Sequence, residues 1–124
     1  MEIMVDAGTI ICIILNEPEK QRIITLTESA ELAVPEMIPF EIGNALSRMY
    51  KRNRLNEEQI IRAYALYETL PLRIVKVNMT KALKLSCKYN IYAYDAYYLE
   101  TSYRLNLPLL TLDGQMKNNG KDMK

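Results

Sequence analysis

Histidine is absent from this sequence of 124 residues, and cysteine occurs only twice. Without histidine, the chain has no imidazole base for a catalytic triad, no histidine proton shuttle and no histidine ligand for zinc. Any hydrolytic chemistry must therefore come from carboxylates, a thiol, hydroxyl groups, lysine or a hard metal ion. Gly/Ser linkers, low-complexity blocks and repeat periods are also missing.

The two cysteines, Cys12 and Cys87, lie far apart and lack the spacing of a metal site. Cys12 lies in the apolar run from Thr9 to Leu15, and Cys87 lies in an apolar pattern that begins at Ala82. We interpret both as small core or boundary hydrophobes in a reducing cytoplasm, with a disulfide as the alternative.

Long hydrophobic runs and a strong net charge are lacking as well. The run from Ile10 to Leu15 is far too short to span a bilayer, and the N-terminus has no positively charged region. The formal net charge of +1 excludes a highly basic nucleic-acid coat, although an enzyme with a local basic face remains compatible. We expect a cytoplasmic protein without a membrane partner.

The composition is that of an ordinary globular protein, with 49% hydrophobic and 25% charged residues. The length fits a single domain over residues 1–124, in which the polar residues 118–124 are expected to fray. A chain of this size buries roughly two thirds of the surface that it exposes when unfolded, so we expect a substantial core.

Short apolar strands alternate with helical patterns along the chain. This order predicts an α/β fold with three layers, in which helices cover both faces of a short, mostly parallel sheet of four or five strands. Thr80 is expected to cap the fifth helix, and Asp95 is expected to start the sixth. The predicted strands cover residues 2–5, 31–34, 73–77 and 109–112, and the predicted helices cover residues 7–15, 18–29, 39–52, 56–70, 82–88 and 95–105.

Four acidic residues lie at or near the ends of these elements. Asp6 and Asp113 directly follow the first and last strands, so both are expected at the carboxyl edge of the sheet, where open α/β sheets bind ligands. Glu41 lies in the first turn of the helix entered from the second strand, near the same edge. Asp95 opens a helix, and a helix start can lie at either edge.

Each acid alone has an ordinary structural explanation, as a helix cap, a first-turn residue or a turn residue. Several acids at one edge need a further explanation, because two carboxylates about 4 Å apart repel by roughly 4 kcal/mol at an effective dielectric near 20. A hard cation such as Mg²⁺ or Mn²⁺ would offset that repulsion. It would also activate water and neutralise phosphate charge, so hydrolysis of phosphodiesters fits best.

Four sequence blocks resemble those of PIN-domain proteins, in the order and spacing of the VapC toxins of toxin–antitoxin pairs. The resemblance covers about residues 2–117, and the four blocks together are far more specific than any one of them. They are Val5-Asp6-Ala7, the stretch Pro-Phe-Glu-Ile-Gly-Asn-Ala-Leu at 39–46, Tyr-Asp-Ala-Tyr-Tyr at 94–98, and Leu-Thr-Leu-Asp at 110–113.

The resemblance implies a PIN-like fold and a Mg²⁺- or Mn²⁺-dependent endoribonuclease. It further implies an RNA substrate, a homodimer, and a cognate VapB-like antitoxin whose C-terminal tail occupies the active-site groove. Carried over residue by residue, it assigns metal binding and catalysis to Asp6, Glu41, Asp95 and Asp113. Asn44 and Thr111 match family positions that orient carboxylates or water.

The sequence departs from the family pattern at two places. The family often has serine or threonine two residues after the first aspartate, where this chain has Gly8, followed by Thr9 as a possible substitute. The chain also ends soon after Asp113, where many relatives continue into a further edge strand. These departures keep open a non-catalytic PIN-like scaffold that binds RNA or protein. A structure-specific DNA nuclease fits less well, because the chain is too short for the usual extra arches.

Two further groups of residues have alternative interpretations. The basic run at the end of the third helix is either a solvated helix end or a contact to RNA phosphates flanking the cleavage site. The tyrosines around Asp95 either pack and form dimer surface or stack on unpaired bases, and we expect Tyr98 to be structural. The basic residues are Arg48, Lys51, Arg52 and Arg54, and the tyrosines are Tyr89, Tyr92, Tyr94, Tyr97, Tyr98 and Tyr103.

Overall fold

A computed structural model describes residues 1–112 of the chain. Within this range, helices and strands alternate as the apolar patterns predict. The predicted site residue Asp113 and the polar residues 118–124 lie outside the described range. The elements are β1 (Glu2–Val5), α1 (Ala7–Ile14), α2 (Lys20–Thr27), β2 (Glu31–Pro35), α3 (Ile38–Lys51), α4 (Glu57–Glu68), β3 (Leu72–Val75), α5 (Met79–Tyr89), α6 (Ala93–Arg104) and β4 (Leu109–Leu110).

The four described strands form one parallel sheet in the order β3-β2-β1-β4. Met4 and Val5 of β1 are completely buried, because β1 has a neighbouring strand on each side and helices above and below. The parallel sheet confirms the predicted fold class. A parallel arrangement also brings the carboxyl ends of β1 and β2 to one edge, from which the chain enters α1 and α3.

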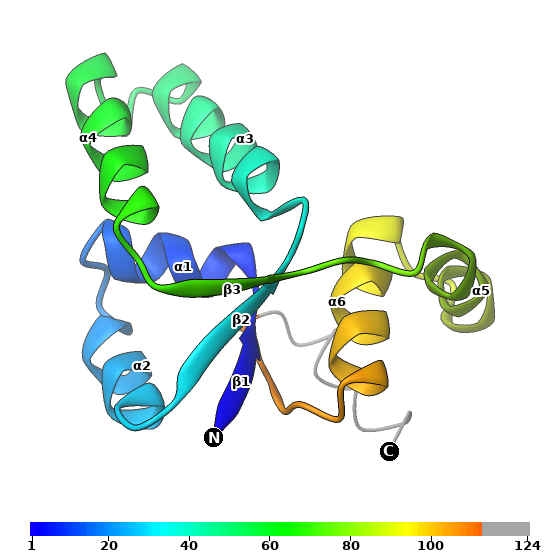
Figure 1. The fold of residues 1–124 in the computed structure, drawn as a ribbon. Coiled ribbons are helices and arrows are strands. Elements are labelled where there is room, and N and C mark those ends of the chain that lie inside the picture. The colour runs from blue at the N-terminus through cyan, green and yellow to red at the C-terminus, as the bar shows by residue number, and fades with distance from the viewer. Residues whose placement is uncertain (113–124) are drawn as a thin grey trace.

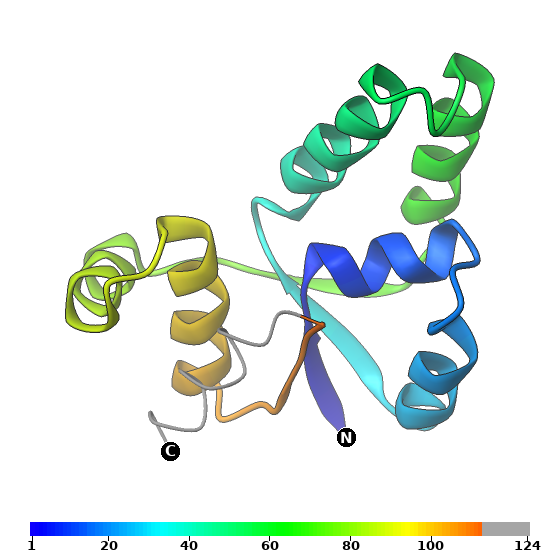
Figure 2. The ribbon, with the colours of Figure 1, turned by 180° about the vertical axis from the view of Figure 1, so that it is seen from behind.

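Helices cover the sheet in two groups. Figures 1 and 2 show α1 to α4 on one side of the sheet, with α5 and α6 on the other. α1 contacts α2, α3 and α4, whereas α6 packs on β1, β2 and β4 and holds α5. The main core includes fully buried side chains from both groups, such as Ile10 of α1 and Tyr98 of α6.

Several element boundaries differ from the predictions. α5 begins at Met79 behind the cap Asn78, whose side chain accepts a hydrogen bond from the backbone N–H of Lys81, so the predicted Thr80 cap is wrong. α6 begins at Ala93, which places Asp95 in its first turn and not at its cap. β3 ends at Val75, two residues before the predicted end, and β4 covers only half of the predicted fourth strand.

The cysteines are both free thiols, as expected, but only Cys12 is buried. Cys87 is exposed on α5, so its interpretation as a core or boundary hydrophobe is wrong. Among residues 1–112, no helix combines the length and the hydropathy needed to cross a membrane.

Candidate active site

Asp6 lies where β1 ends and α1 begins, and its side chain caps that helix. Its Oδ1 accepts the Thr9 backbone N–H at 2.9 Å and the Thr9 hydroxyl at 2.7 Å. Its Oδ2 accepts a hydrogen bond from the hydroxyl of Thr111, which follows β4. Asp6 is only 6% exposed, so these donors compensate a carboxylate that has lost nearly all contact with water.

Glu41 lies in the first turn of α3, near the start of α1. The Tyr98 hydroxyl of α6 donates to Glu41 Oε2 at 3.2 Å and accepts the Ala7 backbone N–H at 3.0 Å. Tyr98 therefore joins the beginnings of α1 and α3 from the opposite helical layer. The second carboxylate oxygen, Oε1, is buried and has no hydrogen-bond partner among the described residues.

The surroundings of Glu41 disfavour its charged form. Burial, followed by the negative charges of Asp6 and Asp95, raises the pKa of Glu41 to about 7, while the Tyr98 hydrogen bond and the positive charge of Arg48 act in the opposite direction. Burial together with the Glu41 charge also raises the pKa of Tyr98, so its hydroxyl remains a proton donor. These mutual effects mean that Asp6, Glu41 and Asp95 share one electrostatic neighbourhood.

The four predicted acids are therefore only partly assembled within the described chain. Asp6 and Glu41 are linked through Tyr98 and Ala7, and Asp95 is half-buried in the first turn of α6. Asp113 lies outside the described residues. Within residues 1–112, no group of three acidic or cysteine side chains is arranged closely enough to hold a metal ion.

The donor chemistry nevertheless fits a hard divalent cation. Within residues 1–112, the buried Oε1 of Glu41 lacks the hydrogen bond that a buried carboxylate oxygen normally has, and the charges of two further carboxylates raise the pKa of Glu41. All available donors are oxygens, as Mg²⁺ and Mn²⁺ prefer. The described residues would supply part of such a site, and a further ligand is required to complete it.

Two threonine hydroxyl groups hold the Asp6 carboxylate. Thr9 and Thr111 are fully buried and both donate hydroxyl hydrogen bonds to Asp6. Thr9 thus provides the hydroxyl contact that the Gly8 departure had put in doubt. A β-carbon at Gly8 would lie 3.7 Å from Asp6 Oδ1, which is ordinary contact, so glycine is not required there for space.

The remaining predicted contacts lie on α3 and beyond its end. Asn44 is exposed one turn after Glu41, and the described part of the chain shows no hydrogen bond from its side chain. Arg48, Lys51 and Arg52 are also exposed. Arg48 lies two turns from Glu41, and its positive charge lowers the pKa of Glu41.

Sequence reasoning expected Tyr98 to be structural, which its burial confirms, but it missed the contacts that the Tyr98 hydroxyl makes. Its hydroxyl connects the backbone N–H of Ala7, 91 residues away, with the side-chain carboxylate of Glu41, 57 residues away. The available signal was its position three residues after Asp95, which places both side chains on one face of a helix. That signal could not separate a buried packing tyrosine from one that holds a carboxylate.

Comparisons with known proteins match nearly the whole chain. The family model for the PIN domain matches residues 3–122. The chain is 28% identical over 120 residues to VapC ribonuclease Mb0985 of Mycobacterium bovis and to ribonuclease VapC9 of Mycobacterium tuberculosis. Each match covers 96% of this chain and 91% of the relative.

Two solved structures share the fold. PAE2754 from Pyrobaculum aerophilum superimposes with a TM-score of 0.79 at 20% identity, covering 98% of this chain and 81% of that protein. VapC20 of Mycobacterium tuberculosis, described as a toxin that cleaves the sarcin–ricin loop, gives a TM-score of 0.69 at 12% identity, with 95% of each chain covered.

Proposed function

Because the chain belongs to the PIN-domain family, we propose that it is a metal-dependent endoribonuclease, the toxin of a VapBC-type toxin–antitoxin pair. The observation that carries the proposal is the shared electrostatic neighbourhood of Asp6, Glu41 and Asp95, in which a buried oxygen of Glu41 has no hydrogen-bond partner among residues 1–112. The relatives named VapC ribonuclease, which match over 96% of this chain, support it.

Asp6, Glu41 and Asp95 would hold a Mg²⁺ or Mn²⁺ ion, and Asp113 would complete the ligand set. When bound, this ion supplies a water molecule of lowered pKa and neutralises charge on the phosphate. Thr9 and Thr111 fix the orientation of the Asp6 carboxylate through their hydroxyl groups. Tyr98 holds Glu41 against the start of α1, so that Oε1 stays available for a ligand.

The substrate would be RNA, and the inhibitor would be a VapB-like antitoxin. The basic side chains of Arg48, Lys51 and Arg52 are exposed on the helix that carries Glu41 and at its end, where they would contact RNA phosphates flanking the cleaved bond. Asn44 would orient a carboxylate or water once the metal is bound. A homodimer is part of the same proposal and rests on the family resemblance.

The decisive experiment compares the wild-type protein with Asp6→Asn. Asparagine is as good a helix cap as aspartate, so this substitution removes the charge and largely preserves α1. With Mn²⁺ present, we expect wild type to cleave cellular RNA at defined positions, detected by sequencing RNA ends. Asp6→Asn and wild type with excess EDTA should both be inactive. Equal cleavage by all three samples would contradict the proposal.

A non-catalytic scaffold is the second candidate, and one observation favours it. The described residues lack a group of three side chains that could hold a metal. A scaffold would bind RNA or a protein with the same affinity in Mn²⁺ and in EDTA, and it would cleave nothing. Isothermal titration of Mn²⁺ separates the candidates, because the nuclease binds the ion through Asp6 whereas the scaffold does not.

A further inference from the structure

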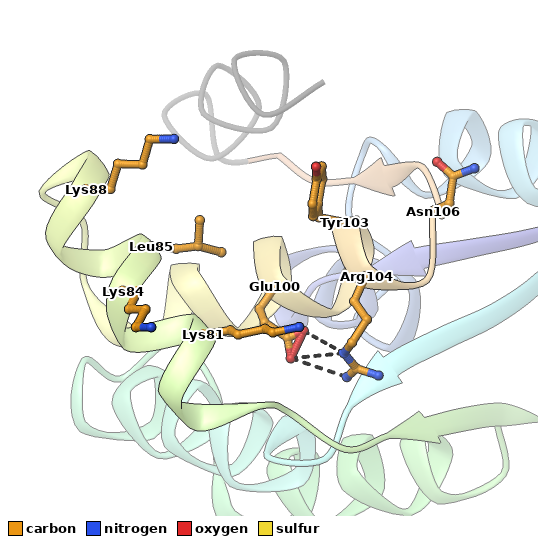
Figure 3. A pocket seen from close by; sticks show the side chains of 8 residues that line it. All are labelled: Lys81, Lys84, Leu85, Lys88, Glu100, Tyr103, Arg104 and Asn106. Carbon is orange, nitrogen blue, oxygen red and sulfur yellow. Dashed lines mark hydrogen bonds and ion pairs between the residues drawn. The ribbon is translucent and has the colours of Figure 1, made fainter.

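A concave surface lies between α5 and α6, away from the carboxylates of the candidate active site. It is a pocket of about 730 Å³, and Figure 3 shows Lys81, Lys84 and Lys88 along its α5 side. Tyr103 and Arg104 line it from the last turn of α6. We call it the lysine pocket. Arg104 follows Asp95 by nine residues of helix, or about 13 Å of axial rise, so this surface is distinct from the candidate active site.

The three lysines lie on one face of α5, since their spacing of three and four residues matches the helical repeat. All three are exposed, and none forms an ion pair within the described part of the chain. Lys88 only approaches the Tyr89 ring, with its Nζ 5.4 Å from the ring centroid. Three like charges around one hollow repel one another, and an anionic occupant would offset that repulsion.

The acidic group in the pocket is already engaged. Glu100 is 2% exposed, and its carboxylate accepts the Asn78 backbone N–H at 2.5 Å and the guanidinium of Arg104 at 2.9 Å. Arg104 also donates to the Lys76 carbonyl oxygen at 2.6 Å. The Glu100–Arg104 pair is thus neutral and internally satisfied, so no described acidic residue compensates the lysine charges.

An aromatic ring completes the surface. Tyr103 is 60% exposed, and its ring faces the pocket in Figure 3. An acidic peptide would use the lysines but gain little from an open aromatic face. Single-stranded RNA would use both, because its phosphates pair with cations and its bases stack on aromatic rings.

We propose that the lysine pocket binds a single-stranded segment of RNA outside the cleaved bond, with phosphates at Lys81, Lys84 and Lys88 and a base stacked on Tyr103. This inference rests on the proposed function for the identity of the substrate. The pocket volume lies within the range of known ligand sites and accommodates a nucleotide. The surface would add affinity for longer RNA without touching the reacting phosphate.

The test measures binding of a fluorescein-labelled single-stranded RNA of about 20 nucleotides by anisotropy, in the Asp6→Asn background to prevent cleavage. Lys81→Gln, Lys84→Gln and Lys88→Gln together should weaken binding by about tenfold or more. They should also reduce the slope of log affinity against log salt by about 2, since each phosphate contact on a single strand contributes about 0.7. Unchanged affinity and slope would overturn the proposal.

A matched control removes three positive charges elsewhere. Lys20→Gln, Arg22→Gln and Arg62→Gln make an equal charge change on α2 and α4, on the other side of the sheet. This variant should keep the salt slope. If it weakens binding as much as the pocket variant does, net charge and not the pocket governs affinity, and the proposal fails.

The aromatic contact is tested separately. Tyr103→Ala should weaken RNA binding by about fivefold or more, whereas Tyr103→Phe should retain it, because stacking needs the ring and not the hydroxyl. Polyglutamate should displace the RNA poorly. If polyglutamate competes as well as RNA at equal charge, and Tyr103→Ala has no effect, the occupant is an acidic protein and the RNA assignment is wrong.

Failure of this inference and failure of the proposed function give different results. If wild type cleaves RNA and the lysine variant cleaves long RNA with an unchanged KM, the pocket is not an RNA site although the nuclease assignment stands. If wild type cleaves nothing and yet the lysines govern RNA binding, the pocket proposal stands and the nuclease assignment fails.

Discussion

Asp6 serves both the fold and the candidate site with one side chain. Capping α1 uses one oxygen for the Thr9 backbone N–H, and the Thr111 hydroxyl binds the other oxygen from beyond β4. An ordinary cap needs only the first of these contacts and remains partly exposed to water. The additional donors and the 6% exposure hold the Asp6 carboxylate in one orientation, and the proposed role as a metal ligand would need such an orientation.

Glu41 should make the metal-free protein less stable as the pH rises. Its pKa is about 7 in the folded protein against an ordinary value of 4.5, so between these values the folded state keeps a proton that the unfolded state releases. The free energy of unfolding therefore falls as the pH rises from about 4.5 to about 7, and the Glu41 contribution stays constant above that range. The full shift corresponds to about 3 kcal/mol, and we expect about 2 kcal/mol once solvent screening is allowed for.

Urea unfolding in EDTA, at pH values from 4.5 to 8, checks this expectation. Glu41→Gln should equal wild type near pH 4.5 and exceed it in stability at pH 8. Glu28→Gln, at the exposed end of α2, controls for the loss of one negative charge. A stability difference between Glu41→Gln and wild type that does not change with pH would contradict the buried-acid explanation.

The Tyr98→Phe variant should distinguish the packing of the buried Tyr98 ring from the positioning of Glu41 by the Tyr98 hydroxyl. The substitution keeps the buried ring and removes the hydroxyl that contacts Ala7 and Glu41, so the Ala7 N–H loses its partner at a cost of about 1–3 kcal/mol. Because Glu41 also loses its support, Mn²⁺ affinity measured by titration calorimetry should fall by about tenfold. Tyr67→Phe, a buried tyrosine of α4, should leave Mn²⁺ affinity unchanged. Lower stability with unchanged affinity would make Tyr98 purely structural.

Among the elements, strands and helices with strong apolar patterns were predictable, whereas helix starts with two suitable caps were not. The predicted start of the fourth helix at residue 56 coincides with the observed cap Asn56, because the capping box of Asn56 with Gln59 is entirely local. Asn78 and Thr80 are both acceptable caps by sequence. The choice of Asn78 is accompanied by a bond from its backbone N–H to Glu100, which lies 22 residues away. Local patterns do not contain that contact.

The start of α5 gives a direct test of this boundary. Asn78→Ala should cost about 1 kcal/mol, because the Lys81 N–H loses its side-chain acceptor. Thr80→Ala, inside the first turn, should change stability by less than about 0.5 kcal/mol. Thermal or urea denaturation of both variants shows whether Asn78 or Thr80 caps α5. A larger loss for Thr80→Ala would place the start of α5 where the sequence pattern suggested.

The candidate site was predictable to the extent that it depends on strand ends. Asp6 follows β1 directly, and a parallel sheet brings the ends of its strands to one edge, so its position followed from the pattern alone. The roles of Thr9 and Tyr98 depend on side-chain direction and on how α6 packs against the start of α1. Such information arises only when distant segments meet.

The whole molecule is arranged so that the candidate site joins both helical layers to the sheet. Asp6 and Glu41 belong to the layer formed by α1 to α4, whereas Tyr98 and Asp95 belong to α6 on the other face. Thr111 adds the segment after β4, which is the last strand in the order of the described sheet. A ligand bound by these groups would oppose separation of the layers, so its effect should extend over the entire fold.

We therefore expect Mn²⁺ to shift the unfolding of the whole domain as a single transition. At a concentration of about 100 times its Kd, an ion that binds only the folded state adds about 2.7 kcal/mol, which corresponds to about 10 °C in Tm for a chain of this size. Calorimetric melting should show this shift for wild type and for the destabilised Asn78→Ala, but not for Asp6→Asn or in EDTA. An equal shift for Asp6→Asn would mean that Mn²⁺ binds elsewhere. Two separate transitions would mean that the layers unfold independently and that the carboxylates do not couple them.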